Sequence, residues 1–394
     1  MKIAMCAPVD LHALARFCGQ ETGGVPPGLG STATTPLIEE LLRRGHEVTL
    51  FTLSNGLAKE TTHEWGRLKV FSGSSRQYGA ARNLYRHEVS YLRRVIAQER
   101  PAFVHAHWTY EFALGALAAG IPMLTTIHDL PWNVLRYFRD RSRAVRLLIA
   151  YSVAMRCHRY TAVSEDAANH FRRYLKPGAD IEVIPNFLSD SIFEFGHSQA
   201  NSNRPFTFAA VLQGFSRRKN ATAALKAFQI VRRIAPESRL KMIGAEYEEE
   251  GPAHRWARQH GLDAGVIFTG IVPYKQMLCV IRDEVDVIVH PSLDEAFSMT
   301  VLESMALAKP VIAGLNTPGI RQALRDGDAG ILTDVRDSNS IARAMLALMK
   351  DPSYRQRVAV NGRNHVSSTY RKDLIVPQYE AVYRSLLAGE AKCA

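Results

Sequence analysis

The sequence predicts an α/β protein with two domains of the doubly wound type. The chain has 394 residues, more than one hydrophobic core usually supports, and its 46% apolar and 22% charged residues are ordinary globular usage. Short apolar runs alternate with helix-forming stretches along both halves. A polar, turn-rich run at 196–205 is typical of a linker. We therefore expect one domain over 1–195, a second over 196–373, and a terminal helix in 374–394 that crosses back to the first domain.

The chain opens with a β-α-β unit. Residues 2–7 and 47–53 predict strands, and 31–44 predicts a helix that Gly45 ends. The intervening stretch from Gly28 to Ala33 matches the dinucleotide pattern G-x-G-x-x-A. Its glycines lie some twenty residues beyond the first strand, and no acid for a ribose follows the second strand. A long glycine-rich loop that ends at a helix therefore describes this segment better than an NAD or FAD site.

Two further short strands, 103–106 and 123–127, are expected in the first half, and the second leads directly into His128. His128 is either a ligand-binding side chain or a core or capping histidine. His105 and His107 alternate along their strand, but no third metal ligand of convincing spacing is near them. We expect them to be structural or to line a cleft.

The net charge of +11 is concentrated in part in the segment 136–159, which has seven arginines against one acid, Asp140. Apolar residues interleave with the arginines, as in a basic amphipathic helix pair. Such a face could meet anionic lipid headgroups or an acidic acceptor, or it could be a solvated surface with its apolar stripe packed inward. Nucleic-acid binding is disfavoured because no recognisable motif accompanies the charge.

Cysteine usage and hydropathy indicate a cytoplasmic protein. The five cysteines are scattered and form no C-x-x-C pair, so neither a disulfide framework nor a zinc site is expected. The N-terminus has no hydrophobic signal region, and the longest mostly apolar stretch, 112–127, is too short and too interrupted to span a bilayer.

In the second half, 206–212 predicts a strand and 221–233 a helix, joined by a loop that contains Arg217, Arg218 and Lys219. Cations in such a loop can neutralise a diphosphate leaving group, although an ordinary exposed basic loop is the competing interpretation. The alternation continues with strands at 239–243, 266–269 and 285–290. Ligands bind at the carboxyl ends of strands in sheets of this kind.

Glu295 and Glu303 stand out on either side of a predicted helix start. The first turn of the helix that begins near Ser298 leaves amides without intrahelical partners, so the N–H groups near Phe297, Ser298 and Met299 can face a diphosphate. Eight positions at about 1.5 Å of rise separate the two carboxylates by roughly 12 Å, comparable with the sugar-to-ribose span of a nucleotide sugar. One carboxylate could accept hydrogen bonds from each sugar ring. The alternative is an acidic helix start followed by an ordinary exposed glutamate.

Several linked blocks resemble the nucleotide-binding half of the retaining glycosyltransferases of family 4. The blocks are His290-Pro291-Ser292, Glu295-Ala296-Phe297, Glu303-Ser304-Met305-Ala306, Lys309-Pro310-Val311 and Asp326-Gly327-Asp328-Ala329-Gly330. The resemblance covers most of the chain, strongly in the second half and loosely in the first. It implies the GT-B fold, in which two Rossmann-like doubly wound domains flank an interdomain cleft.

The resemblance also implies roles for particular residues. Catalytic roles fall on His128, Lys219 and Glu295. Binding of the donor, a UDP- or GDP-hexose, falls on Gly30, Arg218, Lys219, Glu295, Ala296, Phe297, Ser298, Met299 and Glu303. The family often has an arginine about five residues before the lysine, and this chain has Gly214 at that place. The phosphate-neutralising role of that arginine would then fall on Arg218 or Arg217.

The resemblance implies no metal and no cofactor, with the nucleotide sugar as co-substrate. Asp326-Gly327-Asp328 imitates a metal-binding Asp-x-Asp, but its place between a helix and a strand favours a turn. The expected reaction is hexosyl transfer with retention to a hydroxyl acceptor, in glycan, polysaccharide or glycolipid synthesis. A sugar-nucleotide epimerase, a phosphorylase or a non-catalytic binder remains an alternative. The base, sugar and acceptor are not determined by spacing.

Overall fold

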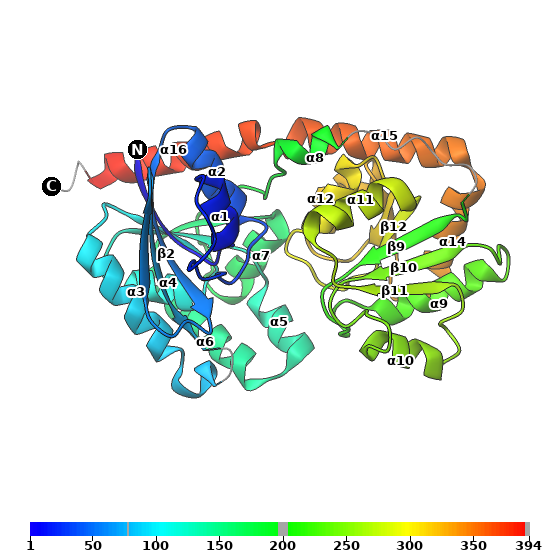
Figure 1. Cartoon of the computed structure of the whole chain (residues 1–394), viewed down its shortest axis with the longest axis horizontal. Helices are drawn as coiled ribbons and strands as arrows, with labels where there is room; N and C mark the ends of the chain where they lie inside the picture. Colours follow the sequence, from blue (N-terminus) through cyan, green and yellow to red (C-terminus); the bar gives the residue numbers. More distant parts are fainter. Residues whose placement is uncertain (77–78, 196–203, 391–394) are drawn as a thin grey trace. The chain divides into compact units, whose positions relative to one another are not determined.

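The computed structural model describes residues 1–76, 79–195 and 204–390 and has the predicted α/β fold class (Figure 1). It divides into two compact units. Unit 1 comprises Met1–Phe187 together with the segment from Lys372 onward, and unit 2 comprises Leu188–Arg371. Each unit has its own sheet and hydrophobic core.

Unit 1 contains an eight-stranded sheet in the order β3-β4-β2-β1-β5-β6-β7-β8, parallel except for the β3-β4 hairpin. Its strands are β1 (Lys2–Cys6), β2 (Glu47–Asn55), β3 (Thr61–Trp65), β4 (Leu68–Ser75), β5 (Val104–His107), β6 (Met123–Ile127), β7 (Arg159–Ala162) and β8 (Ile181–Val183). Strands β2, β4 and β3 lie on one side of β1, and β5 begins the series on its other side. The strand order therefore reverses between β1 and β5. In doubly wound sheets, ligands bind at the carboxyl ends of the strands on either side of such a reversal.

Helices pack on both faces of this sheet, as is usual for parallel strands. They are α1 (Leu11–Phe17), α2 (Thr34–Arg43), α3 (Arg86–Glu99), α4 (Glu111–Ala118), α5 (Pro131–Phe138), α6 (Arg141–Arg156), α7 (Glu165–Tyr174) and α16 (Lys372–Glu390). Helix α16 is joined to α2 and its following turn by polar contacts. Lys372 Nζ lies 2.9 Å from Glu40 Oε2, and His46 Nε2 lies 2.7 Å from Glu380 Oε1. These contacts hold the last helix of the chain on unit 1.

Unit 2 contains a six-stranded parallel sheet in the order β11-β10-β9-β12-β13-β14. Its strands are β9 (Thr207–Val211), β10 (Arg239–Ile243), β11 (Val266–Gly270), β12 (Val287–His290), β13 (Val311–Gly314) and β14 (Ile331–Thr333). The order reverses between β9 and β12. The loops after these two strands therefore lie at the carboxyl ends of the strands, where sheets of this kind bind ligands.

The helices of unit 2 include the expected ones at 221–233 and from Ser298 onward, together with others that were not expected, at 190–194, 320–323 and 352–369. They are α8 (Asp190–Glu194), α9 (Ala221–Arg232), α10 (Pro252–Gln259), α11 (Tyr274–Glu284), α12 (Met299–Ala306), α13 (Ile320–Ala323), α14 (Ser338–Lys350) and α15 (Pro352–Thr369). Asp337 caps α14 by accepting from the amides of Asn339 and Ser340. The short 3-10 turn Arg325–Gly327 occupies the Asp326-Gly327-Asp328 segment, which agrees with its interpretation as a turn.

The division between the units differs from the predicted boundary at residue 195. Unit 1 already ends at Phe187, because Leu188 N donates to Tyr370 O and Arg363 donates to Phe193 O, so α8 is tied to unit 2. The predicted linker 196–205 lies outside the described residues except for Arg204 and Pro205. Within the described part of the chain, no helix is both long and apolar enough to cross a membrane.

Candidate functional site: a lysine and two glutamates in unit 2

Lys219 lies in the loop between β9 and α9, at the reversal point of the unit 2 sheet. The loop is anchored at its end by Asn220, whose side-chain amide donates to Pro291 O (3.1 Å) and Val335 O (2.8 Å). Asn220 has a φ of 52°, a left-handed conformation that asparagine tolerates better than most residues. Arg218 O accepts from Leu293 N at 2.8 Å. The basic loop and the loop that follows β12 are therefore held together by backbone contacts.

Glu295 lies in that second loop, and its carboxylate meets the lysine directly. Lys219 Nζ lies 2.5 Å from Glu295 Oε1, and His290 Nε2 lies 3.3 Å from the same oxygen. Both side chains of the lysine–glutamate pair are largely buried, with 11% and 13% of their surfaces exposed. Residues 76 positions apart in the sequence thus form one buried ion pair at the ligand-binding edge.

The electrostatics of this pair keep Glu295 ionised. Burial by itself raises the pKa of the Glu295 carboxyl, but Lys219, the hydrogen bond from His290 and the charge of Arg218 outweigh it and hold the pKa well below its usual range. Arg218 lies 3.8 Å from Asp294, the next carboxylate in the loop. A fixed negative charge among cations can accept ligand hydroxyls while the cations face an anionic group.

The turn after Gly314 packs against the loop that contains Glu295. Thr317 Oγ1 donates to Ser292 O at 2.7 Å. Gly319 has a φ of 71°, and a Cβ at this position would collide with the carbonyl of Ala296. Only glycine allows this close approach. The carboxylate of Glu295 is therefore positioned by backbone packing on both sides of its loop.

Helix α12 starts at Met299, one residue after the predicted start, with Ser298 as its N-cap. The Ser298 side chain makes no capping hydrogen bond, so the first-turn amides of α12 are not satisfied by it. Phe297 is buried and packs edge-on against Tyr370, with ring centroids 5.4 Å apart. The side chain of Phe297 is therefore a packing element, and the backbone of Phe297, Ser298 and Met299 is what this segment offers to an anion.

Glu303 lies on α12 and is 3% exposed, which excludes the exposed glutamate considered as the alternative. Tyr274, the first residue of α11, donates its hydroxyl to Glu303 Oε1 at 2.9 Å. Burial raises the pKa of the Glu303 carboxyl to about 7, against the opposing effect of the Tyr274 hydrogen bond. Sequence patterns did not identify Tyr274, because a tyrosine at a helix start has many structural uses.

The raised pKa makes Glu303 a source of pH-dependent stability. The Glu303 carboxyl binds its proton more tightly in the folded than in the unfolded chain. The folded protein therefore loses stability as pH rises from about 4.5 through about 7. Above that window the loss of stability is on the order of 3 kcal/mol. We expect Glu303→Gln to raise the melting temperature at pH 8 and to have little effect at pH 5. Equal shifts at both pH values would contradict the assignment.

Candidate residues in unit 1

His128 follows β6 in unit 1 and is part of a histidine pair that the sequence did not predict. Its Nε2 lies 2.8 Å from His107 Nδ1, and its ring stacks on Trp108 with centroids 4.3 Å apart. Burial lowers the pKa of His128 to about 3, so the ring is neutral at physiological pH. His105 hydrogen-bonds Tyr383 and Thr126, which agrees with its structural interpretation. His128 can therefore bind a polar ligand but does not supply an imidazolium.

The glycine-rich loop of unit 1 is pinned to the end of β1. Gly30 N donates to Val9 O at 3.0 Å, and a Cβ on Gly28 would collide with the same carbonyl. By contrast, a Cβ on Gly30 would meet no atom within 4 Å. Gly28 and Gly30 both have a left-handed backbone, with φ of 80° and 73°, which favours glycine at each position, but only at Gly28 does a contact also exclude a Cβ.

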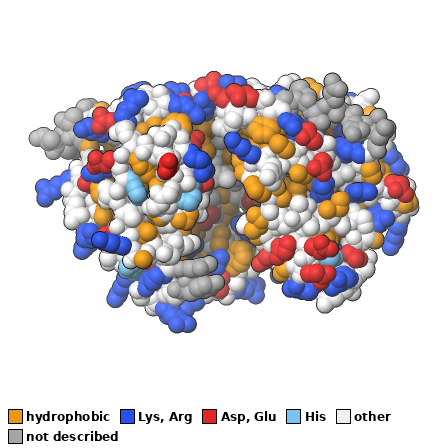
Figure 2. Space-filling model, in the orientation of Figure 1, with side chains coloured by type: hydrophobic (Ala, Val, Ile, Leu, Met, Phe, Trp, Pro, Cys, Tyr) orange, Lys and Arg blue, Asp and Glu red, His pale blue; other side chains and the backbone are white. Residues whose placement is uncertain are grey.

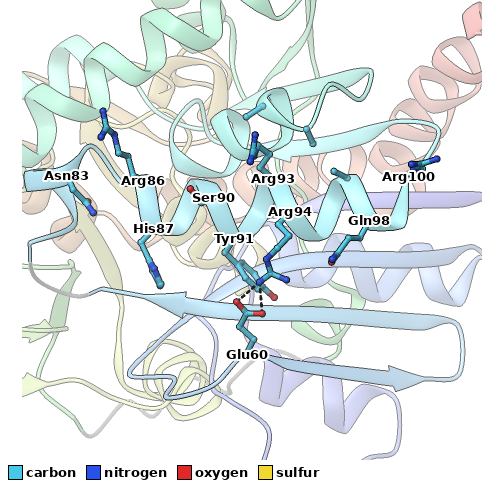
Figure 3. Close-up of a pocket in the computed structure, with 13 residues that line it drawn as sticks. Glu60, Asn83, Arg86, His87, Ser90, Tyr91, Arg93, Arg94, Gln98 and Arg100 are labelled. Carbon is cyan, nitrogen blue, oxygen red and sulfur yellow. Dashed lines mark hydrogen bonds and ion pairs between the residues drawn. The ribbon is translucent and has the colours of Figure 1, made fainter.

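A wide, open hollow of about 1330 Å³ lies along α3 on unit 1 (Figure 3). It is lined by Arg86, Arg93, Arg94 and Arg100 and by one carboxylate, Glu60, which pairs with Arg94. None of the predicted site residues lines it. The lining of this hollow is therefore cationic. Figure 2 shows further Lys and Arg side chains spread over the visible face of unit 1.

Comparison with known proteins

Two family profiles together match nearly the whole chain. Residues 30–191 match Glycosyltransferase Family 4, and residues 193–365 match Glycosyl transferases group 1. Together with the fold, these matches define a glycosyltransferase with the GT-B fold. The chain belongs to the group 1 glycosyltransferases of family 4.

Relatives with curated functions share about a quarter of their residues with this chain. The N-acetyl-alpha-D-glucosaminyl L-malate synthase of Bacillus anthracis is 24% identical over 393 residues, which cover 92% of this chain and 96% of the relative. The glycogen synthase of Mycobacterium tuberculosis is 27% identical over 308 residues, which cover 74% of this chain and 70% of the relative.

Solved structures of low sequence identity share the fold. Sucrose-phosphate synthase from Thermosynechococcus elongatus superposes with a TM-score of 0.76 at 18% identity and covers 99% of this chain and 100% of its own. Anabaena HepE in complex with UDP superposes with a TM-score of 0.67 at 17% identity and covers 98% of this chain and 100% of its own. The predicted GT-B fold is therefore confirmed.

Proposed function

We propose that this glycosyltransferase moves a hexose from a UDP- or GDP-sugar to a hydroxyl acceptor with retention at the anomeric carbon. The observation that carries the proposal is the buried Lys219–Glu295 pair at the sheet edge, directly before the uncapped start of α12. This combination offers a carboxylate for sugar hydroxyls, a cation for the leaving group and amides for phosphate oxygens. The complex of HepE with UDP supports a uridine nucleotide as the first to test.

The roles follow from this geometry. Glu295 accepts from hydroxyls of the donor sugar, and Lys219, assisted by Arg218, stabilises the charge that grows on the leaving diphosphate. The amides of Phe297, Ser298 and Met299, after Ala296, bind the phosphates, and Glu303 accepts from the ribose hydroxyls. In unit 1, neutral His128 binds a sugar hydroxyl and the loop at Gly30 approaches the donor.

The reaction needs neither a metal nor a cofactor in this proposal. The anomeric C–O bond to the phosphate breaks, and a C–O bond to the acceptor oxygen forms on the same face of the sugar. The acceptor hydroxyl passes its proton to the leaving phosphate oxygen, so no protein carboxylate needs to act as a base. The buried Glu295 is already ionised and paired, which suits binding better than proton transfer.

A thermal-shift panel of UDP-, GDP- and ADP-sugars, followed by NMR of the product, tests the proposal. We expect one nucleotide to raise the melting temperature and the product to keep the anomeric configuration of the donor. An isomerised donor without an acceptor product would favour an epimerase, and phosphate-dependent sugar release would favour a phosphorylase. Binding of a nucleotide sugar with neither transfer nor hydrolysis would identify a non-catalytic binder.

We also propose that unit 1 contacts anionic membrane from the cytoplasmic side. Within the predicted basic segment, Val145, Leu147 and Ile149 are buried, but Leu148 and Met155 are 64% and 70% exposed. Outward apolar side chains among arginines favour a lipid surface over a merely solvated face. This placement fits a glycolipid or polysaccharide acceptor, and the free cysteines of the described chain fit a reducing compartment.

Vesicle sedimentation tests this contact. We expect binding to vesicles that contain phosphatidylserine, weaker binding in high salt, and a several-fold loss in the double variant Leu148→Ser, Met155→Ser. Ile234→Ser, which removes a comparably exposed apolar side chain from unit 2, is the matched control. Equal binding by neutral vesicles, or no binding by either, would contradict the contact.

A further inference from the structure

A small pocket of about 160 Å³ lies at the reversal point of the unit 1 sheet. Its walls include Trp108 and Tyr110 from the segment after β5, Asp129 from the segment after β6, and Leu29 of the glycine-rich loop. All of these follow the carboxyl ends of strands or belong to the loop pinned there. The position is the one at which doubly wound sheets bind small molecules.

Two charged side chains complete the wall and are not fully paired. Glu111 Oε1 lies 2.7 Å from Arg146 Nη2, but within the described residues Glu111 Oε2 and Arg146 Nε are buried without a hydrogen-bond partner. Glu111 is 7% exposed. A buried polar atom without a hydrogen bond costs free energy. Glu111 Oε2 can accept and Arg146 Nε can donate, so a ligand that forms hydrogen bonds with both atoms would be stabilised here.

The neighbouring groups define the charge of the pocket. Arg146 is held between the rings of Tyr85 and Tyr110, at 5.3 and 5.4 Å from their centroids. Tyr110 donates its hydroxyl to Asp129 at 2.8 Å. The wall therefore contains two carboxylates against one guanidinium, which disfavours an anionic ligand.

Trp108 supplies an apolar wall. It has a φ of 63°, a left-handed conformation that is uncommon for a bulky residue, and its ring stacks on His128. Strained residues of this kind cluster at functional sites, where the surrounding structure holds them. The indole places an aromatic surface beside polar groups, the combination that binds the apolar faces and the hydroxyls of a sugar-like ring.

We propose that this pocket binds the acceptor and takes one six-membered polyhydroxylated ring without an anionic group. A hydroxyl donates and accepts at once, so a single hydroxyl can satisfy both Glu111 Oε2 and Arg146 Nε, whereas a phosphate or carboxylate could satisfy only the arginine. A cavity of about 150 Å³ in another protein holds benzene, which sets the scale at one ring. The acceptor role, though not the binding itself, rests on the proposed glycosyltransferase function.

Calorimetry on the full chain tests the inference with four probes: myo-inositol, glucose, myo-inositol 1-phosphate and glucose 6-phosphate. We expect at least one neutral ring to bind, and to bind about tenfold or more tightly than its phosphate ester, as a factor of ten corresponds to one lost charge-assisted contact. Glu111→Gln should reduce the ratio of the two affinities, neutral ring over phosphate ester, by about tenfold, because one negative charge is removed from the pocket wall. Leu29→Trp, which fills the pocket, should abolish binding of the neutral ring.

Glu88→Gln is the matched control, since Glu88 is a buried unit 1 carboxylate that pairs with Arg76 at 2.9 Å and does not line the pocket. Tighter binding of the phosphate esters, or no binding of either neutral ring by the unaltered chain, would overturn the inference. Hydrolysis of a nucleotide sugar, measured in parallel, reports on the proposed function separately. Donor hydrolysis without ring binding would remove only the pocket. Ring binding without donor turnover would remove the glycosyltransferase proposal and with it the acceptor role, but not the ring-binding site.

Discussion

Glu295→Gln is expected to lower kcat by about two to three orders of magnitude while changing the Kd for free nucleotide less than about threefold. The carboxylate is ionised and lies between Lys219 and His290, where it can bind sugar hydroxyls most strongly as the leaving group departs. Removing one preorganised electrostatic contact of this kind typically costs that much in turnover. Steady-state kinetics and calorimetry with nucleotide on the same preparation measure the two effects.

The control for this experiment must separate chemistry from folding. Loss of the charge leaves Lys219 buried without its partner, which is destabilising, so thermal melting must show that the variant is folded at the assay temperature. Glu284→Gln, which removes an exposed unit 2 carboxylate 2.8 Å from Lys241, should leave kcat unchanged. An equal loss of nucleotide affinity and turnover in Glu295→Gln would show that Glu295 binds the nucleotide and not the sugar.

Glu303→Ala is expected to raise the Kd of the donor and of free nucleotide alike, by about ten- to a hundredfold. A ribose hydroxyl that donates to a buried carboxylate forms a charge-assisted hydrogen bond, which contributes roughly 1.5–3 kcal/mol and therefore a factor of about ten to a hundred in Kd. Because the pKa of Glu303 is about 7, the carboxylate is mostly protonated at pH 6 and mostly ionised at pH 8. Donor affinity should therefore rise about tenfold across this interval.

The nucleotide sugar is the proper probe for that pH profile, because its diphosphate diester does not titrate in this range. Glu303→Gln should bind the donor weakly with a flat profile, and Tyr274→Phe should shift the profile to higher pH, since the Tyr274 hydroxyl lowers the pKa of Glu303. A wild-type profile that is flat, or one that falls with pH, would be incompatible with a ribose-binding carboxylate.

The sequence predicted the candidate site best where its parts follow one another directly in the chain. Strand β12, the polar loop with Glu295 and the helix start at Ser298 follow one another in the chain, so local patterns predict them with an error of about two residues. The hairpin of β3 and β4 and helix α3 were not predicted. Helix α3 buries Leu92, Val95 and Ile96 at helical spacing, so its signal was present in the sequence and was missed. The pairing of β3 with β4 depends on contacts between the two strands, which local patterns describe poorly.

By itself, the sequence determined the α/β class, the family and the segments that contain the candidate site, because each depends on short-range periodicity and on motifs within a few turns of chain. Tertiary structure alone decided which groups meet. Lys219 pairs with Glu295 from 76 positions away, Tyr274 reaches Glu303 from 29, and Arg146 reaches Glu111 from 35. Burial raises the pKa of Glu303, whereas Lys219, His290 and Arg218 outweigh burial and lower the pKa of Glu295, because the segments that carry these groups become neighbours only in the folded sheet.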